Sequence, residues 1–208
     1  MVDFVVTGLS ANSVPYKDAL ELQRATHRAV VGGSSPDTVI MLEHPSVYTA
    51  GKRTEPAERP TDGTPVIDVD RGGKITWHGP GQLVGYPIMR LPEPIDVVGY
   101  VRRLEGILID VLSRFGIDGA RVEGRSGVWM RGSDKIAAIG VRVANGVTMH
   151  GFALNVNNSF EAYDKIIACG LADAGVTSMS RELGRDVPVT AVVPVVQAAF
   201  VDALVGIR

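Results

Sequence analysis

The sequence contains a single cysteine, Cys169, among 208 residues. One thiol cannot form an intramolecular disulfide, and a solitary cysteine is typical of a protein in a reducing compartment. The chain also lacks an excess of basic residues, because its formal net charge is -2 at pH 7. Such a balance gives no field that would attract nucleic acid. We therefore expect a cytoplasmic protein that does not bind nucleic acid.

Long apolar runs are absent as well. Residues 1–16 have neither a basic n-region nor a continuous apolar h-region, so no secretory signal is visible. The most apolar segment, Val187–Ile207, is interrupted by prolines, a glutamine and an aspartate. This pattern favours a packed helix over a membrane span. We expect no partnership with a membrane.

Clusters of metal ligands are also missing. The four histidines are dispersed, and with one cysteine they do not reach the spacing of a metal site. No phosphate loop and no dinucleotide-binding glycine motif occurs, so nothing in the sequence indicates ATP or NAD. We expect neither a metal nor another cofactor. His44 and His150 are instead candidates for hydrogen bonding near a reaction centre.

What is present is a mixture of helix and strand patterns. Apolar residues recur at helical spacing in Asp96–Phe115. A helix is also predicted over Pro15–Val31, with Ser13 as its expected cap and Gly32 and Gly33 after its end, and a final helix from about Thr190. Shorter helices are predicted near Phe160–Ile166 and from about Thr177. Strand-like runs occupy Thr38–Leu42, Val47–Ala50 and Lys74–Trp77.

The clearest local signal is a hairpin. The runs Lys135–Val143 and Val147–Val156 are strand-like, and Asn145 and Gly146 lie between them. Asn followed by Gly between two strands is the strongest short-range hairpin signal. Because regular strand–helix alternation is missing elsewhere, we expect an α+β fold: a single domain over residues 1–208 with a mixed β-sheet packed by helices.

The densest motif is the segment Arg71–Pro87, RGGKITWHGPGQLVGYP, which holds five glycines. Glycine permits positive φ and close backbone approach, so such a run can line a ligand pocket. Arg71 and His78 bracket a short strand, and Ile75 and Trp77 would add an apolar wall. The alternative is that the glycines only form tight turns between strands.

Cys169 lies in an apolar stretch and is followed by a glycine. A lone cysteine among apolar neighbours is most often a buried hydrophobic residue. The alternative is a nucleophile, which needs a nearby group that deprotonates the thiol. Lys135, at the head of the hairpin, is a candidate for this role, although a lysine at the end of a strand is usually a solvated surface group. The sequence does not itself bring the two residues together.

These residues resemble the lipoyl(octanoyl) transferase family. The segment Arg71–Pro87 matches the family motif R-G-G-x-x-T-x-H-G-P-G-Q-L-x-x-Y-P without departure. The runs KIAAIGVRV from Lys135, HGFALNV from His150 and ACG at 168–170 are also similar. The resemblance covers most of the chain and implies a fold similar to that of biotin and lipoate protein ligases.

The resemblance also implies roles for particular residues. Cys169 would be the catalytic nucleophile and Lys135 its partner. The acyl substrate would be bound by three segments: Arg71, Gly72, Gly73, Lys74, Ile75, Thr76, Trp77 and His78; Ala138, Ile139 and Gly140; and Gly151, Phe152 and Ala153.

The reaction that the resemblance implies is the transfer of an octanoyl group from octanoyl-acyl carrier protein to a lysine of a lipoyl domain, through a thioester on Cys169. The acceptors would be lipoyl domains of 2-oxoacid dehydrogenase E2 subunits and the glycine cleavage H protein. Exchange of one thioester for another, followed by amide formation, requires no ATP. Main-chain N–H groups beside Cys169, or those of Gly72 and Gly73, are candidate oxyanion donors.

Two alternatives remain open. An ATP-dependent lipoate or biotin ligase of the same fold would need no cysteine, and it would form no product from octanoyl-acyl carrier protein without nucleotide. A non-catalytic module that binds fatty acyl groups would not need Lys135 paired with Cys169. Such a module would gain no covalent acyl group when it is incubated with an acyl donor.

Overall fold

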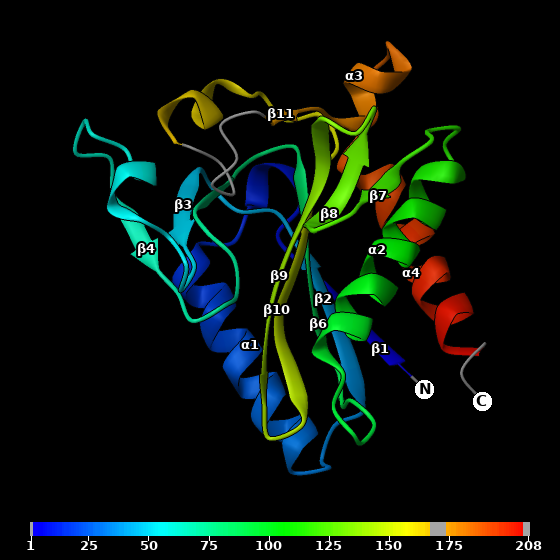
Figure 1. Ribbon diagram of the computed structural model, residues 1–208. Helices are drawn as coiled ribbons and strands as arrows, with labels where there is room; N and C mark the ends of the chain where they lie inside the picture. Colours follow the sequence, from blue (N-terminus) through cyan, green and yellow to red (C-terminus); the bar gives the residue numbers. More distant parts are fainter. Residues whose placement is uncertain (1, 167–173, 206–208) are drawn as a thin grey trace.

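The computed structural model describes residues 2–166 and 174–205 (Figure 1). Within these residues the main sheet has eight strands. Its order is β1 (Val2–Val6), β2 (Asp37–Leu42), β6 (Gln82–Ile88), β10 (Val147–Asn155), β9 (Asp134–Ala144), β8 (Arg125–Met130) and β7 (Ala120–Val122), and β11 (Gly175–Val176) pairs with β9. The pairs β1–β2 and β9–β11 are parallel and the others antiparallel, so the predicted mixed sheet is confirmed.

Helices cover both faces of this sheet (Figure 1). Helix α1 (Tyr16–Val31) packs on one face, and α2 (Val97–Ser113) and α4 (Val189–Val205) pack on the other. Side chains of β10 alternate between the two layers, as the period of a strand requires. Phe152 and Leu154 join the core under α2 and α4, whereas Met149 and Ala153 join the core under α1. The expected α+β architecture is therefore confirmed.

A smaller sheet carries the glycine-rich segment. It has the order β4 (Val66–Asp68), β3 (Val47–Ala50) and β5 (Thr76–His78), with β3 parallel to β4 and antiparallel to β5. The strand predicted over Lys74–Trp77 begins two residues late. Lys74 belongs instead to a turn, because its carbonyl accepts a hydrogen bond from Nη1 of Arg71 at 2.9 Å.

The hairpin is confirmed. Strands β9 and β10 pair without interruption from Ala144 and Val147 to Ala137 and Leu154. The connecting Asn145–Gly146 has φ values of 51° and 72°. Positive φ at both positions is the geometry that favours Asn followed by Gly in a two-residue turn.

The remaining helices are short. They are α3 (Met179–Leu183) and the 3-10 helices η1 (Ser10–Asn12), η2 (Pro56–Glu58) and η3 (Glu161–Lys165). The prediction that Ser13 caps α1 is wrong, since Pro15 occupies the N-cap position and no side chain bonds to the first turn. Helix α3 does have a side-chain cap, because Oγ of Ser178 accepts a hydrogen bond from N–H of Arg181.

Of the helices in the described ranges, none combines the length and the hydropathy that a membrane span needs.

Candidate active site

A cavity of about 460 Å³ lies beside the β9–β10 hairpin. Most of the expected substrate-binding residues line it: Arg71, Gly73, Lys74, Thr76, His78, Ala138, Ile139, Gly140, Gly151, Phe152 and Ala153. Lys135 lines it as well. Three expected residues are not among those that line it. Ile75 and Trp77 are buried, and the N–H of Gly72 is bonded to the Val141 carbonyl of β9.

The lining also includes residues to which the sequence reasoning gave no part in the pocket. These are Tyr16, Arg53, Val84, Tyr86, Val97, Val98, Val101, Arg102, Glu105, Gly124, Arg125 and Ser126, together with His150, for which only nearby hydrogen bonding was expected. Tyr86 belongs to the matched motif and was detectable from it. The residues of α2 were not, because helical periodicity does not tell which helix end borders a cavity.

Arg71 organises the glycine turn from within. Its Nη1 donates hydrogen bonds to the carbonyls of Gly72 at 3.0 Å and Lys74 at 2.9 Å. Its Nη2 donates to the carbonyl and the hydroxyl of Thr49, at 2.9 and 3.0 Å. A guanidinium offers five donors in a fixed geometry, so one side chain ties the turn to β3.

Two other groups of this segment already have partners. The N–H of Gly72 donates to the carbonyl of Val141 at 2.9 Å, so Gly72 does not fit the expected role of oxyanion donor. The ammonium of Lys74 binds the carboxylates of Glu58 and Glu55, which raise the pKa of this lysine. Its charge is thereby neutralised at the rim of the cavity.

Lys135 is buried, and its ammonium lies 4.5 Å from the centroid of the Trp129 ring. A cation over the face of an indole ring is stabilised by the ring quadrupole. The side chain borders both the cavity and a smaller adjoining pocket, which Ala174 also lines. Lys135 is therefore not the solvated surface group that a lysine at the end of a strand usually is.

Cys169 lies outside the described residues. The chain that follows it is attached to the strand of Lys135, because Val176 in β11 pairs with Lys135 and N–H of Thr177 donates to the Lys135 carbonyl at 3.1 Å. Ala174, beside Lys135, follows Cys169 by five residues.

Two buried histidines, His44 and His78, pack against Tyr16 of α1, and His78 lines the cavity. Nδ1 of His44 lies 2.7 Å from the carbonyl of Val14, and its Nε2 lies 2.7 Å from the hydroxyl of Tyr86. Because a carbonyl only accepts, Nδ1 carries the proton and Nε2 accepts from the tyrosine. His78 is bonded in the same way, with Nδ1 2.8 Å from Oε1 of Gln82. Burial lowers the pKa of His44 to about 4 and that of His78 to about 3, so both rings are neutral.

Acidification is expected to destabilise the fold through these rings. An unfolded histidine takes up a proton near its ordinary pKa of about 6.5, whereas the pKa of folded His44 is lowered to about 4. The unfolded chain therefore binds more protons between these two values, and the free energy of unfolding falls as the pH is lowered through that window. For His44 the loss is about 3 kcal/mol.

Urea unfolding of the wild type and of His44→Gln at pH 7 and pH 4.5 measures this loss. Glutamine can still donate to the Val14 carbonyl and accept from Tyr86, but it does not titrate. The variant should therefore lose less stability than the wild type on acidification. Equal losses in the two proteins would assign the acid sensitivity to other groups.

Known proteins resemble this chain at the level of sequence. A family model described as the lipoyl protein ligase A/B catalytic domain matches residues 15–201. An octanoyltransferase of Clavibacter sepedonicus is 67% identical over 212 positions, which cover 98% of this chain and 91% of that protein. An octanoyltransferase of Salinispora arenicola is 61% identical, with 97% of this chain and 96% of that protein covered.

Solved structures resemble it in fold. A bipartite lipoate protein ligase of Thermoplasma acidophilum superposes with a TM-score of 0.75 at 15% identity, covering 98% of this chain and 84% of that one. A biotin protein ligase of Aquifex aeolicus superposes with a TM-score of 0.54 at 13% identity, covering 98% and 68%. At such identities the likeness shows the fold alone.

The fold and the matched family model thus define a catalytic domain of the lipoyl protein ligase class. Within this class, the high identity to octanoyltransferases over nearly the whole chain is decisive. The chain belongs to the lipoyl(octanoyl) transferase family, and it is an acyltransferase.

Proposed function

We propose that this chain transfers an octanoyl group from octanoyl-acyl carrier protein to the ε-amine of a lysine in a lipoyl domain, through a thioester on Cys169. The observation that carries the proposal is the buried ammonium of Lys135 at an acyl-sized cavity. The names of the relatives support octanoyl as the group transferred. The whole chain, residues 1–208, would act as one catalytic domain in the cytoplasm.

The first half-reaction loads the enzyme. Lys135 accepts the proton of the Cys169 thiol or holds the thiolate by its charge. The sulfur attacks the thioester carbonyl of the donor, the bond from the carbonyl to the carrier sulfur breaks, and the carrier leaves as a thiol after taking up the proton. One thioester replaces another of similar energy, so no nucleotide is consumed.

The second half-reaction releases the product. The ε-amine of the acceptor lysine attacks the acyl-enzyme carbonyl, its proton passes to Lys135, and the bond to Cys169 breaks as the amide forms. The proposed acceptors are lipoyl domains of 2-oxoacid dehydrogenase E2 subunits and the glycine cleavage H protein. The archaeal ligase of the same fold was solved as part of a lipoylation system with its E2 lipoyl domain, which supports this class of acceptor.

The walls of the cavity suit an apolar chain. Three of its polar side chains are bonded to the protein itself: Arg71 to its own turn, His78 to Gln82 and the Tyr86 hydroxyl to His44. These residues therefore present carbon surface to a ligand without leaving a polar group unpaired. Ala138 and Ala153 leave room between the walls.

Product formation without nucleotide tests the proposal. The protein is incubated with octanoyl-acyl carrier protein and a lipoyl domain after apyrase treatment, and the mass of the lipoyl domain is followed. A gain of one octanoyl group supports the transferase. Dependence of this gain on added ATP would instead indicate the ligase chemistry of the related fold.

Replacement of Ala153 by leucine should shorten the preferred acyl chain. Ala153 is buried in the layer under α1 and lines the cavity, so three added carbon atoms take space from the substrate. We expect the ratio of hexanoyl to octanoyl transfer, compared as kcat/KM, to rise about tenfold, since each methylene is worth about 0.8 kcal/mol. Ala25→Leu, on the exposed side of α1, is the matched control and should leave the ratio unchanged.

Gly151 is less suitable for this test. A Cβ atom at Gly151 would lie 2.3 Å from the carbonyl oxygen of Gly85 and 2.4 Å from Cδ of Pro87. A larger residue there would therefore push β6 away before it filled the cavity. The glycine therefore permits close approach of two strands. Its small size does not mainly serve to leave space for the substrate.

A further inference from the structure

His150 adopts a left-handed backbone conformation inside β10, with φ at 57°. Non-glycine residues rarely take this conformation, and those that do are concentrated at functional sites. The neighbouring strand offers a cause. The register of β6 and β10 places Pro87 opposite His150, and proline has no N–H to donate to the ladder. The N–H of His150 donates instead to Oε1 of Gln23 in α1, at 2.9 Å.

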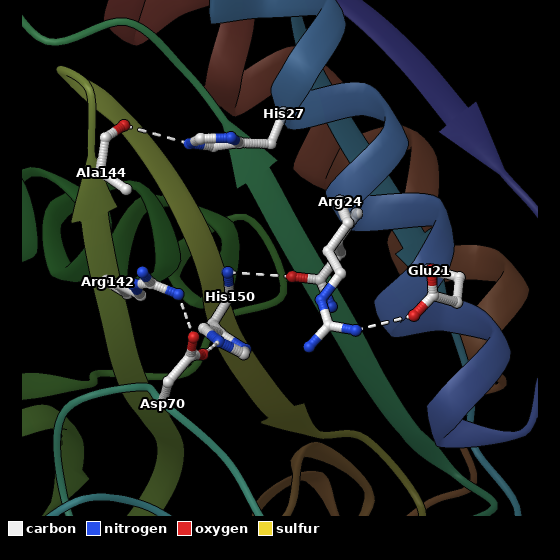
Figure 2. Close-up of polar contacts among 8 residues, drawn as sticks. Glu21, Arg24, His27, Asp70, Arg142, Ala144 and His150 are labelled. Atoms are coloured by element: carbon white, nitrogen blue, oxygen red, sulfur yellow. Dashed lines mark hydrogen bonds and ion pairs between the residues drawn. The ribbon is translucent and has the colours of Figure 1, made fainter.

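This conformation moves the imidazole to the other face of the sheet. Alternation would place His150 with Phe152 and Leu154, in the core under α2 and α4. Its ring instead contacts Asp70 (Figure 2). Asp70 also binds Arg142, whose side chain lies on the face of the sheet opposite to that core. His150 lines the acyl cavity from this face.

Asp70 fixes the ring there. Nε2 of His150 donates to Oδ1 of Asp70 at 2.8 Å, and the guanidinium of Arg142 binds the other carboxylate oxygen (Figure 2). Burial lowers the pKa of His150, so the ring is neutral and Nε2 carries its single proton. Nδ1 is buried without a hydrogen-bond partner among the described residues. The contact with Asp70 is therefore the bond that holds the side chain.

The position of His150 along the hairpin is distant from Lys135. His150 pairs with Val141, six residues further along β9, which corresponds to roughly 20 Å of strand. Between these two levels the cavity passes Ala138, Gly140 and Ala153. An extended octanoyl chain from a thioester near Lys135 covers only part of this span and points toward the imidazole, so the side chains of Lys135 and His150 have to occupy the remainder.

We propose that His150 determines chain length by closing the end of the acyl cavity opposite Lys135, and that Asp70 is the positioning residue that holds the imidazole in place. The proposal rests on the proposed octanoyl transfer. It explains why a strained conformation is retained at this position: a residue with ordinary strand geometry would direct its side chain into the core and leave the cavity longer.

The test compares octanoyl, decanoyl and dodecanoyl donors, each as the acyl carrier protein thioester, on the wild type and His150→Gly. Glycine accepts the positive φ without strain and removes the wall. The decanoyl to octanoyl ratio of kcat/KM should rise at least about tenfold, because the enlarged cavity can bury the two additional methylene groups of the decanoyl chain. His150→Asn, which also tolerates positive φ and is shorter than histidine, should change the ratio in the same direction.

Asp70→Ala tests the positioning role. It leaves His150 in the chain but removes its partner, so the ratio should shift toward decanoyl as it does in His150→Gly. The double variant should match His150→Gly alone, since two residues that act through one ring are not additive. The matched control is His27→Ala, which removes another histidine that bonds to the hairpin, at the Ala144 carbonyl outside the cavity (Figure 2). Its ratio should stay at the wild-type value.

Calorimetric titration with octanoate, decanoate and dodecanoate gives a readout that is independent of transfer. If His150→Gly or His150→Asn binds decanoate more tightly relative to octanoate than the wild type does, the result supports His150 as the residue that closes the cavity. Unchanged ratios in both variants, with a wild type that transfers octanoyl, would overturn the inference and leave the proposed function intact. A wild type that transfers no acyl group would overturn the proposed function itself. Additive effects of Asp70→Ala and His150→Gly would remove the positioning role of Asp70.

Discussion

Replacement of Cys169 by alanine or by serine is expected to abolish octanoyl transfer, with a loss of at least about 1,000-fold in kcat. Alanine has no nucleophile, and the serine hydroxyl is a far weaker one without a base matched to its pKa. Intact mass after incubation with octanoyl-acyl carrier protein measures the first half-reaction, and the mass of the lipoyl domain measures the second.

The two readouts separate the possible failures. Both variants should lack the covalent octanoyl group and should unfold at the wild-type temperature. Near-normal transfer by either variant would eliminate the thioester mechanism. If a variant still gains an octanoyl group on another residue, that residue would be identified as the nucleophile.

Replacement of Lys135 by methionine is expected to slow transfer by roughly ten- to thirtyfold or more. Methionine nearly keeps the length and the apolar packing of the lysine against Trp129 but removes the charge. A nearby cation lowers the pKa of a thiol, so its loss reduces the fraction of Cys169 present as thiolate near neutral pH. Partial recovery of the rate at higher pH would mean that Lys135 only sets this fraction. No recovery would mean that it also accepts the proton of the attacking amine.

The pH dependence of iodoacetamide alkylation tests the pair directly, because it requires neither protein substrate. The profile of Lys135→Met should lie at higher pH than that of the wild type. Lys17→Met, at an exposed lysine on α1, is the matched control and should follow the wild type. Overlapping profiles of Lys135→Met and the wild type would show that Lys135 does not tune the thiol.

The parts of the fold that were predictable are those specified locally. The hairpin followed from Asn145 and Gly146, because two adjacent residues must take positive φ in a tight turn. Helix α2 followed from its apolar spacing, since one face of it packs in the core. The start of α1 was mispredicted because proline at the N-cap leaves Ser13 outside the helix.

The residues of the site were predictable where a motif named them. The contacts that each residue makes were not, because they depend on residues distant in sequence. The sequence could place Gly72 in the pocket segment, but only the fold reveals that its N–H is bonded to Val141. Trp77 was expected in an apolar wall, yet its indole packs against Tyr163 of η3 and donates to Ser46, just before β3. Alternation alone would have placed His150 in the core. Its actual position goes with a left-handed backbone, whose N–H bonds to Gln23 in α1, and with the contact to Asp70.

The internal bonding of His44 and His78 has a consequence for the lifetime of the proposed acyl-enzyme. A thioester is lost to hydrolysis when a base activates a water molecule beside it. The free lone pair of His44 is occupied by the Tyr86 hydroxyl, and Nε2 of His78 lies 3.5 Å from the hydroxyl of Thr49. Both rings have a pKa well below neutrality, which also makes them weak bases. Neither ring is therefore an effective general base, which leaves Lys135 as the proposed proton acceptor beside the acyl group.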